Sequence, residues 1–265
     1  SYEFDDLLEE FEILKNQMKW GSSFSYSCSA IKGFSQGEMM DLIQKRRLDT
    51  SIAIATISSS LKKNNKIKFK NLNKLSFLKK KTPLLIGGAE TFLQEGTLFL
   101  NNLHEDITII LSGSNAFKNF LNLKLNIKNK IILLLSGSEM KKIKEIKKKN
   151  FLRKNNISYL VIEKDFMTKE TRSFEKKKII ISESTALNPL LLTGKILISL
   201  KVKELNLAYF DGDYQTEKGR LVMNETEESL KFLKKKIAIK TLTKSFLDVP
   251  KLNLWNNSGI LKNLR

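Results

Sequence analysis

The chain has 265 residues, a formal net charge of +19 and 41% hydrophobic residues, enough to bury the core of one large domain or two small ones. No apolar run of about 18 residues occurs and the first residues are acidic, so we expect neither a membrane span nor a signal peptide, and we expect a cytoplasmic protein. The single cysteine, Cys28, excludes an internal disulfide, as is usual in reducing compartments.

The positive charge comes almost entirely from lysine, in a chain also rich in asparagine and isoleucine. Clustered lysines bind phosphate backbones, but arginine, which makes bidentate contacts with phosphates and bases, is scarce. A chain rich in lysine and asparagine is typical of an AT-rich genome. We therefore do not expect nucleic acid as the main partner, and a basic nucleic-acid-binding protein stays as the second alternative.

The first part of the chain has only helical patterns. Apolar residues recur every three or four positions from Phe4 to Met18, and short helices follow up to Leu61. This predicts an all-helical unit over residues 1–61 and counts against a (β/α)8 barrel, which alternates from end to end. Residues 62–81 contain nine lysines and no acid, which predicts a basic linker.

From residue 82 to residue 265 apolar strands alternate with helices. Strands separated by helices and apolar throughout are typical of a parallel sheet that is covered on both faces. The sequence therefore predicts an α/β fold, in which the helical unit is followed by a Rossmann-like, mostly parallel sheet with helices on both faces. The expected strands after the first are 107–111, 131–135, 159–162, 179–181, 205–210 and 237–241, and the expected helices after the first are 116–123, one up to 151, 189–203 and 226–235.

The segment from Thr82 to Leu103 begins the α/β region and is its most informative part. An apolar run stops at Gly87 and Gly88, and apolar residues then recur at helical spacing. A strand, a glycine turn and a helix place free backbone N–H groups at the carboxyl end of a strand, where they favour an anion. The turn has neither a GxGxxG pattern nor the lysine of a P-loop, so a plain βα turn stays open.

Small polar loops follow the other strands too, with sequences such as LSGSNA, LSGSEM and FDGDYQ. In a doubly wound sheet such loops converge on one edge, where short hydroxyl side chains and free N–H groups suit phosphates and sugar hydroxyls. We expect a nucleotide or sugar-phosphate ligand there. The predicted ligand-binding residues are Gly87, Gly88, Glu90, Ser112, Ser114, Asn115, Ser136, Ser184, Thr185, Asp211 and Tyr214.

Asp211 and Asp213 are the candidate catalytic residues. Their spacing at a strand end suits Mg²⁺ with a bound nucleotide or phosphate, and it suits a turn cap equally well; we assign no other cofactor. The single histidine, His104, is expected near a helix end at the surface, and no histidine cluster or CxxC motif indicates a dedicated metal site.

A family resemblance covers most of the chain. The segment from Trp20 to Arg46 resembles the helical region after the catalytic barrel in bacterial HMG-CoA lyase-like (DRE-TIM, pyruvate-type) aldolases of surface-polysaccharide loci. The matching residues are Trp20, Gly21, Tyr26, Ser29, Ala30, Glu38, Met40, Lys45 and Arg46. IGGAE, SNA at Ser114, SESTA at Ser182, DG at Asp211 and TLT at Thr241 are similar to the C-terminal Rossmann-like domain of that family, which is in turn similar to pterin diphosphokinases and motility-associated glycosyltransferases.

The resemblance implies an accessory, C-terminal part of an aldolase-like protein in cell-surface carbohydrate biosynthesis, whose residues 1–61 pack on a catalytic barrel. The lyase site of that family uses an aspartate and two histidines, which a chain with one histidine does not supply. The alternative is a stand-alone glycosyl- or phosphoryl-transferase with Asp211 or Asp213 as base or metal ligand. Two loops depart from the family: Ser136 to Lys142 has no histidine, and EKDFMTKET replaces a loop expected to be rich in proline and glycine.

Overall fold

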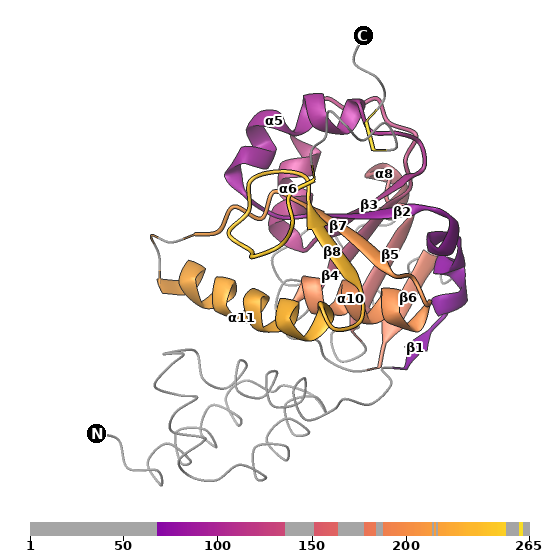
Figure 1. Cartoon of the computed structure of the whole chain (residues 1–265). Coiled ribbons are helices and arrows are strands. Elements are labelled where there is room, and N and C mark those ends of the chain that lie inside the picture. The colour runs from indigo at the N-terminus through magenta and orange to yellow at the C-terminus, as the bar shows by residue number, and fades with distance from the viewer. Residues whose placement is uncertain are drawn as a thin grey trace, which may run out of the picture. The chain divides into compact units, whose positions relative to one another are not determined.

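The computed structural model of the chain describes residues 68–135, 151–163, 178–183, 188–213, 215, 217–252 and 260–261 (Figure 1). The predicted helical unit 1–61 and the first residues of the predicted linker lie outside the described residues, as do Cys28 and the Trp20 to Arg46 segment that carries the family resemblance.

One eight-stranded sheet forms the centre of the described fold. Its strand order is β1-β6-β5-β4-β3-β2-β7-β8, and β1 alone runs antiparallel to its neighbour. The expected α/β fold with a Rossmann-like, mostly parallel sheet is therefore confirmed. The strands are β1 (Phe69–Lys70), β2 (Thr82–Ile86), β3 (Ile107–Ser112), β4 (Ile131–Leu135), β5 (Tyr159–Glu163), β6 (Ile179–Ser182), β7 (Glu204–Ala208) and β8 (Ala238–Thr241).

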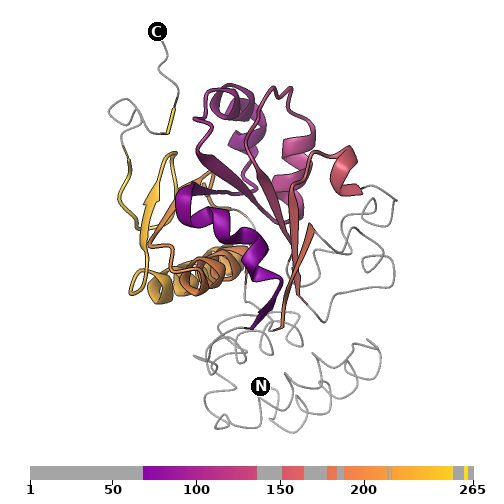
Figure 2. The ribbon, with the colours of Figure 1, turned by 90° about the vertical axis from the view of Figure 1, so that its right-hand side faces the viewer.

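Helices cover both faces of the sheet. Helices α5 (Glu90–Asn101), α6 (Ser114–Leu121) and α8 (Phe151–Lys154) lie on one face, and α10 (Pro189–Ser199) and α11 (Glu217–Leu233) lie on the other (Figures 1 and 2). This explains why β4 is apolar throughout. All five of its residues are buried, because successive side chains point to opposite faces of the sheet and both faces are covered.

The segment predicted as a linker contains regular structure from residue 69 onward. β1 pairs with β6, and the 3₁₀ helix η1 (Leu72–Lys80) follows it. Leu75 and Leu78 are buried, at the spacing of three residues that places side chains on one side of a 3₁₀ helix. The lysines of η1 occupy other positions. The apolar spacing of the helix was therefore not recognised in a segment so rich in lysine.

Several element boundaries differ from expectation. α11 begins at Glu217 rather than near Thr226, α10 ends at Ser199 rather than at Lys203, and β7 ends at Ala208 rather than at Phe210. α10 is almost uncharged because most of it is buried, and Asn188 caps its first turn by accepting a hydrogen bond from the Leu191 backbone N–H at 2.9 Å. Among the described helices, none combines the length and the apolar character needed to cross a lipid bilayer.

Candidate functional site

The strand order reverses beside β2. The chain adds β3, β4, β5 and β6 in sequence on one side of β2, and it then returns to place β7 and β8 on the other side. β2 is parallel to both β3 and β7, so the carboxyl ends of β2 and β7 lie next to each other. In open α/β sheets this switch point leaves a crevice in which ligands bind. We call this end of the parallel strands the carboxyl edge and the opposite end the amino edge.

Gly87 and Gly88 form the turn after β2, and both allow other segments to approach closely. A Cβ atom on Gly87 would lie 2.0 Å from the carbonyl oxygen of Tyr209, and a Cβ atom on Gly88 would lie 2.8 Å from Cβ of Asn115. The Gly87 N–H donates to the Ala208 carbonyl at 2.8 Å. The two glycines therefore let the end of β2 contact both the end of β7 and the start of α6.

Helix α5 begins directly after this turn, at Glu90. No side chain caps its first turn, and the first N–H groups of a helix have no partner within the helix. The Thr91 hydroxyl in the same turn donates a hydrogen bond to the carboxylate of Asp211. The Asn119 amide on α6 donates to the Ala89 carbonyl at 3.1 Å. The starts of α5 and α6 and the loop after β7 thus converge at the switch point.

Tyr209, the first residue after β7, has an unusual backbone. Its φ is 61°, in the left-handed region that residues other than glycine rarely adopt, and its N–H donates to the Thr243 hydroxyl at 2.7 Å. Its side chain is only 2% exposed and packs on the rings of Phe92 and Phe99, with centroids 5.0 and 5.4 Å away. This turn directs the loop that carries Asp211 across the end of β2.

The pKa of the Tyr209 phenol is raised above its usual value. Burial is the main cause, because it disfavours the phenolate, and the carboxylates of Glu95 and Asp211 repel the phenolate further. Tyr209 therefore stays protonated and neutral at physiological pH. Its hydroxyl is available as a hydrogen-bond donor rather than as a base.

This pKa shift predicts a pH dependence of stability. Below about pH 10 both the folded and the unfolded chain hold the phenol proton, and above it only the folded chain does, so the free energy of unfolding falls as the pH rises. Tyr209→Phe removes this dependence. In urea unfolding from about pH 8 to pH 11, the stability difference between wild type and Tyr209→Phe should shift steadily against wild type. Parallel stability curves would contradict the shift.

The two candidate catalytic aspartates point to different partners. The Asp211 carboxylate accepts a hydrogen bond from the hydroxyl of Thr91, at the start of α5. Asp213, which follows Gly212 (φ 83°), accepts the Gln215 N–H at 3.0 Å and lies against Gly219 of α11, where an added Cβ would be 2.3 Å from the Asp213 Cγ atom. Asp213 thus stabilises the turn before α11. The described residues contain no group of three or more Asp, Glu, His or Cys side chains suited to a metal ion.

The structure brings together part of the predicted set. Gly87, Gly88, Glu90 and Asp211 lie at the switch point, and Ser112, Ser114 and Asn115 lie at the neighbouring turn after β3. Ser114 is fully buried at the start of α6, whereas Asn115 is exposed beside Gly88. Four predicted residues lie outside the described part of the chain: Ser136, Ser184, Thr185 and Tyr214.

Three residues of the site did not belong to the predicted set: Thr91, Asn119 and Tyr209. Thr91 carried a weak signal, because it is a hydroxyl residue in the first turn after the glycines. Tyr209 carried none, since its apolar ring continues the strand pattern. His104 lies before β3, at the amino edge, where its Nδ1 accepts the Asp106 N–H at 3.2 Å, away from the switch point.

Comparison with known proteins adds nothing to this assignment. No protein-family model, curated protein sequence or solved structure matches the chain. The resemblance to the aldolase family therefore stays a prediction from short motifs, and the structural conclusion is a Rossmann-like domain whose strand order reverses between β2 and β7.

Proposed function

We propose that the crevice between β2 and β7 binds a nucleotide, a nucleotide-sugar or a phosphorylated sugar. The observation that carries the proposal is the hydrogen bond from Thr91 to Asp211, which joins the uncapped start of α5 to the loop after β7 at the point where the strand order reverses. Uncapped N–H groups at a helix start donate to phosphate oxygens, and a carboxylate accepts hydrogen bonds from sugar hydroxyls.

The charges at this edge define how such a ligand is held. Glu90 and Asp211 place two carboxylates beside the first turn of α5, and they repel a bare phosphate. The phosphate is therefore bound by backbone N–H groups of the Gly88 to Thr91 turn, and the sugar hydroxyls face Asp211, which keeps the negative groups apart. Thr91 occupies one carboxylate oxygen of Asp211, and the other accepts a ligand hydroxyl.

The family resemblance supports a biological role for this binding. It points to an accessory part of an aldolase-like protein in cell-surface carbohydrate biosynthesis, whose residues 1–61 dock on a separate catalytic barrel. Co-expression of the chain with an aldolase barrel of this family tests that role. Co-purification that is lost when residues 1–61 are deleted supports the role, and independent migration of the two proteins in gel filtration contradicts it.

A glycosyl- or phosphoryl-transferase is the second candidate, and the position of Asp211 favours it. A carboxylate held by a neighbouring hydroxyl at a strand end can accept a proton from an attacking sugar hydroxyl. Incubation with CMP-sugars or ATP and a sugar acceptor, followed by product analysis, separates the two candidates. Turnover that Asp211→Asn abolishes identifies a transferase, whereas binding without turnover identifies an accessory domain.

Asp211→Asn should abolish the thermal stabilisation by ligand. A ligand at about a hundred times its dissociation constant adds roughly 2.7 kcal/mol to the free energy of unfolding. At about 2–4 °C per kcal/mol for a domain of this size, this raises the midpoint by about 5–11 °C. Thermal unfolding with CMP, CTP, ATP, CMP-sugars and sugar phosphates, each with and without Mg²⁺, measures the shift. Asp213→Asn is the matched control and should keep the shift, because Asp213 faces the α11 turn. An undiminished shift in Asp211→Asn would show that the ligand does not bind at Asp211, and it would contradict the proposed site.

A further inference from the structure

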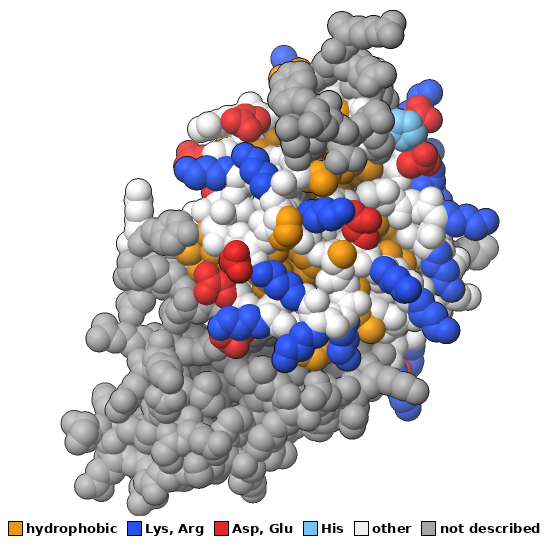
Figure 3. Space-filling model, in the orientation of Figure 1, with side chains coloured by type: hydrophobic (Ala, Val, Ile, Leu, Met, Phe, Trp, Pro, Cys, Tyr) orange, Lys and Arg blue, Asp and Glu red, His pale blue; other side chains and the backbone are white. Residues whose placement is uncertain are grey.

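Basic side chains gather at the amino edge of the sheet, opposite the candidate site. Apart from β3, every parallel strand is entered through a segment that carries lysine, and the segment before β3 instead carries Glu105 and Asp106. The lysines nearest each strand start are Lys81, Lys130, Lys154, Lys178, Lys203 and Lys236. Figure 3 shows blue side chains gathered on the side where Figure 1 draws η1 and the starts of β7 and β8. At the carboxyl edge, positively and negatively charged side chains are mixed.

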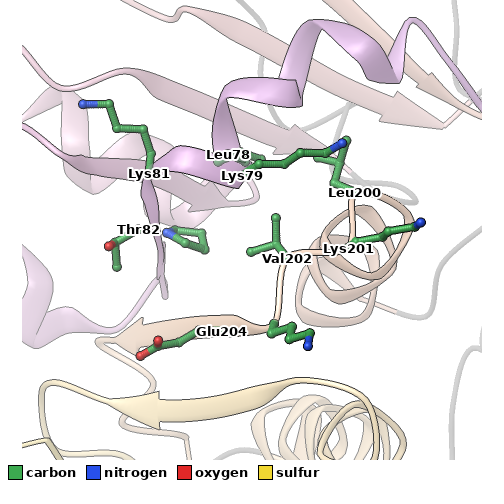
Figure 4. A pocket seen from close by; sticks show the side chains of 10 residues that line it. Leu78, Lys79, Lys81, Thr82, Leu200, Lys201, Val202 and Glu204 are labelled. Atoms are coloured by element: carbon green, nitrogen blue, oxygen red, sulfur yellow. The ribbon is translucent and has the colours of Figure 1, made fainter.

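A shallow pocket of about 390 Å³ lies within this basic edge, between η1, the start of β2 and the end of α10. Its wall is apolar at Leu78, Leu200 and Val202. Figure 4 shows that the ammonium groups of Lys81 and Lys201 point away from the pocket on opposite sides. The lysines therefore reach outward to a surface that faces the whole edge, rather than inward to a small ligand.

Two acids of this edge have partners among nearby lysines. Asp106 is paired with Lys81, whose ammonium group holds the pKa of that carboxyl below its usual value, and Glu204 is paired with Lys240 at 3.2 Å. Lys79, Lys201 and Lys203, which line the pocket, form no ion pair with an acid in the described part of the chain. Parallel strands lie about 4.8 Å apart, so the edge from β6 to β8 presents this charge over roughly 30 Å.

Two exposed leucines lie at the same end of the molecule. Leu98 in the last turn of α5 is 71% exposed, and Leu121, the last residue of α6, is 44% exposed. Both helices start at the carboxyl edge and run toward the amino edge, because each follows a parallel strand. The basic edge therefore carries apolar side chains that are able to enter the headgroup region of a bilayer.

We propose that the amino edge of the sheet docks on the surface of an anionic phospholipid bilayer. The charge is carried by lysines, which act as point charges and need no bidentate geometry, and each lysine near an anionic leaflet strengthens binding. Nucleic acid fits less well, because proteins that bind single strands stack bases on exposed aromatic rings, and the large exposed apolar side chains among the described residues are leucines and a valine. This inference concerns a surface separate from the proposed ligand crevice.

Sedimentation of the full chain with lipid vesicles tests the proposal. The chain should bind phosphatidylcholine vesicles that contain about 30% phosphatidylglycerol, should not bind pure phosphatidylcholine vesicles, and should bind more weakly as the salt concentration rises. The test variant combines Lys79→Gln, Lys201→Asn and Lys203→Gln. Each lysine at an anionic surface contributes about fivefold, so the partition coefficient should fall by about a hundredfold. Asparagine is chosen at 201 because the φ of that residue is 60°.

The matched control removes three charges from the carboxyl edge instead, with Lys68→Gln, Lys244→Gln and Lys251→Gln, and should change the partition coefficient by less than about fivefold. Circular dichroism and the thermal midpoint verify that both triple variants are folded. Leu98→Ser with Leu121→Ser should lower the binding that remains at high salt. Equal losses in the two triple variants would overturn the proposal, and so would binding to duplex DNA or RNA at physiological salt that exceeds binding to the anionic vesicles.

Discussion

Gly87→Ala should lower the free energy of unfolding by about 3 kcal/mol. The new Cβ atom would lie 2.0 Å from the carbonyl oxygen of Tyr209 and 2.8 Å from its carbonyl carbon. Both are backbone atoms, so no side-chain rotation relieves the contact. The N–H of Gly87 also holds the end of β2 to the Ala208 carbonyl, and the two strand ends have to separate. Urea unfolding followed by circular dichroism measures the loss.

Gly96→Ala in helix α5 is the matched control for Gly87→Ala. Its added Cβ would meet the Phe92 ring at 2.7 Å and Leu123 Cδ1 at 2.9 Å. These are side-chain rather than backbone atoms, although the buried Phe92 ring has to shift slightly, and alanine in a helix interior gains about 1 kcal/mol over glycine. Its net cost should therefore be smaller than that of Gly87→Ala. Equal stability of the two variants would contradict the close approach of β2 and β7. It would also contradict the proposed ligand site between them.

Phe92→Ala should cost about 3–5 kcal/mol of unfolding free energy, as expected for a buried aromatic side chain. Phe92 is fully buried, belongs to the core between α5 and the sheet, and supports the Tyr209 ring at 5.0 Å between centroids. Its loss removes both packing area and the support of the turn after β7. The same variant should therefore weaken ligand binding, which a ligand titration at a temperature below its own midpoint can show.

Leu98→Ala in the same helix is the control for this substitution. Leu98 is 71% exposed, so its truncation should change the unfolding free energy by less than about 0.5 kcal/mol. Phe92→Leu should lie between the two, because leucine restores part of the buried volume. Equal costs for Phe92→Ala and Leu98→Ala in urea unfolding would mean that α5 presents a different face to the sheet.

The apolar strands were predictable because burial on both faces leaves an uninterrupted run of Leu and Ile, and β4 spans the predicted 131–135. The return of the chain to the free side of β2 was not predictable, because no local sequence pattern encodes which strand β7 will join. The 3₁₀ helix η1 was missed because a short apolar stripe at Leu75 and Leu78 lies among lysines. The early start of α11 was missed because Gly219 interrupts the helical pattern.

The candidate site was predictable only in part, for the same reason. The turn at Gly87 and the loop at Asp211 both follow strands, and the carboxyl ends of parallel strands share an edge, so their proximity followed from the fold class. The hydrogen bond between Thr91 and Asp211 joins residues 120 positions apart and depends on β2 and β7 being neighbours. The left-handed turn at Tyr209 has no sequence signal, since a tyrosine after LNLA continues a strand pattern.

The position of β2 has a consequence for how the protein is made. Leu84 of β2 pairs with Asn206 of β7, so the ribosome completes β2 long before its second neighbour exists. Until residues 204–208 have emerged, the middle of the later sheet is an open edge strand, a template for pairing with other chains. The crevice, which needs both strands, therefore forms only after β7 has emerged. A pause in synthesis between β6 and β7 should therefore prolong the exposure of this edge of β2.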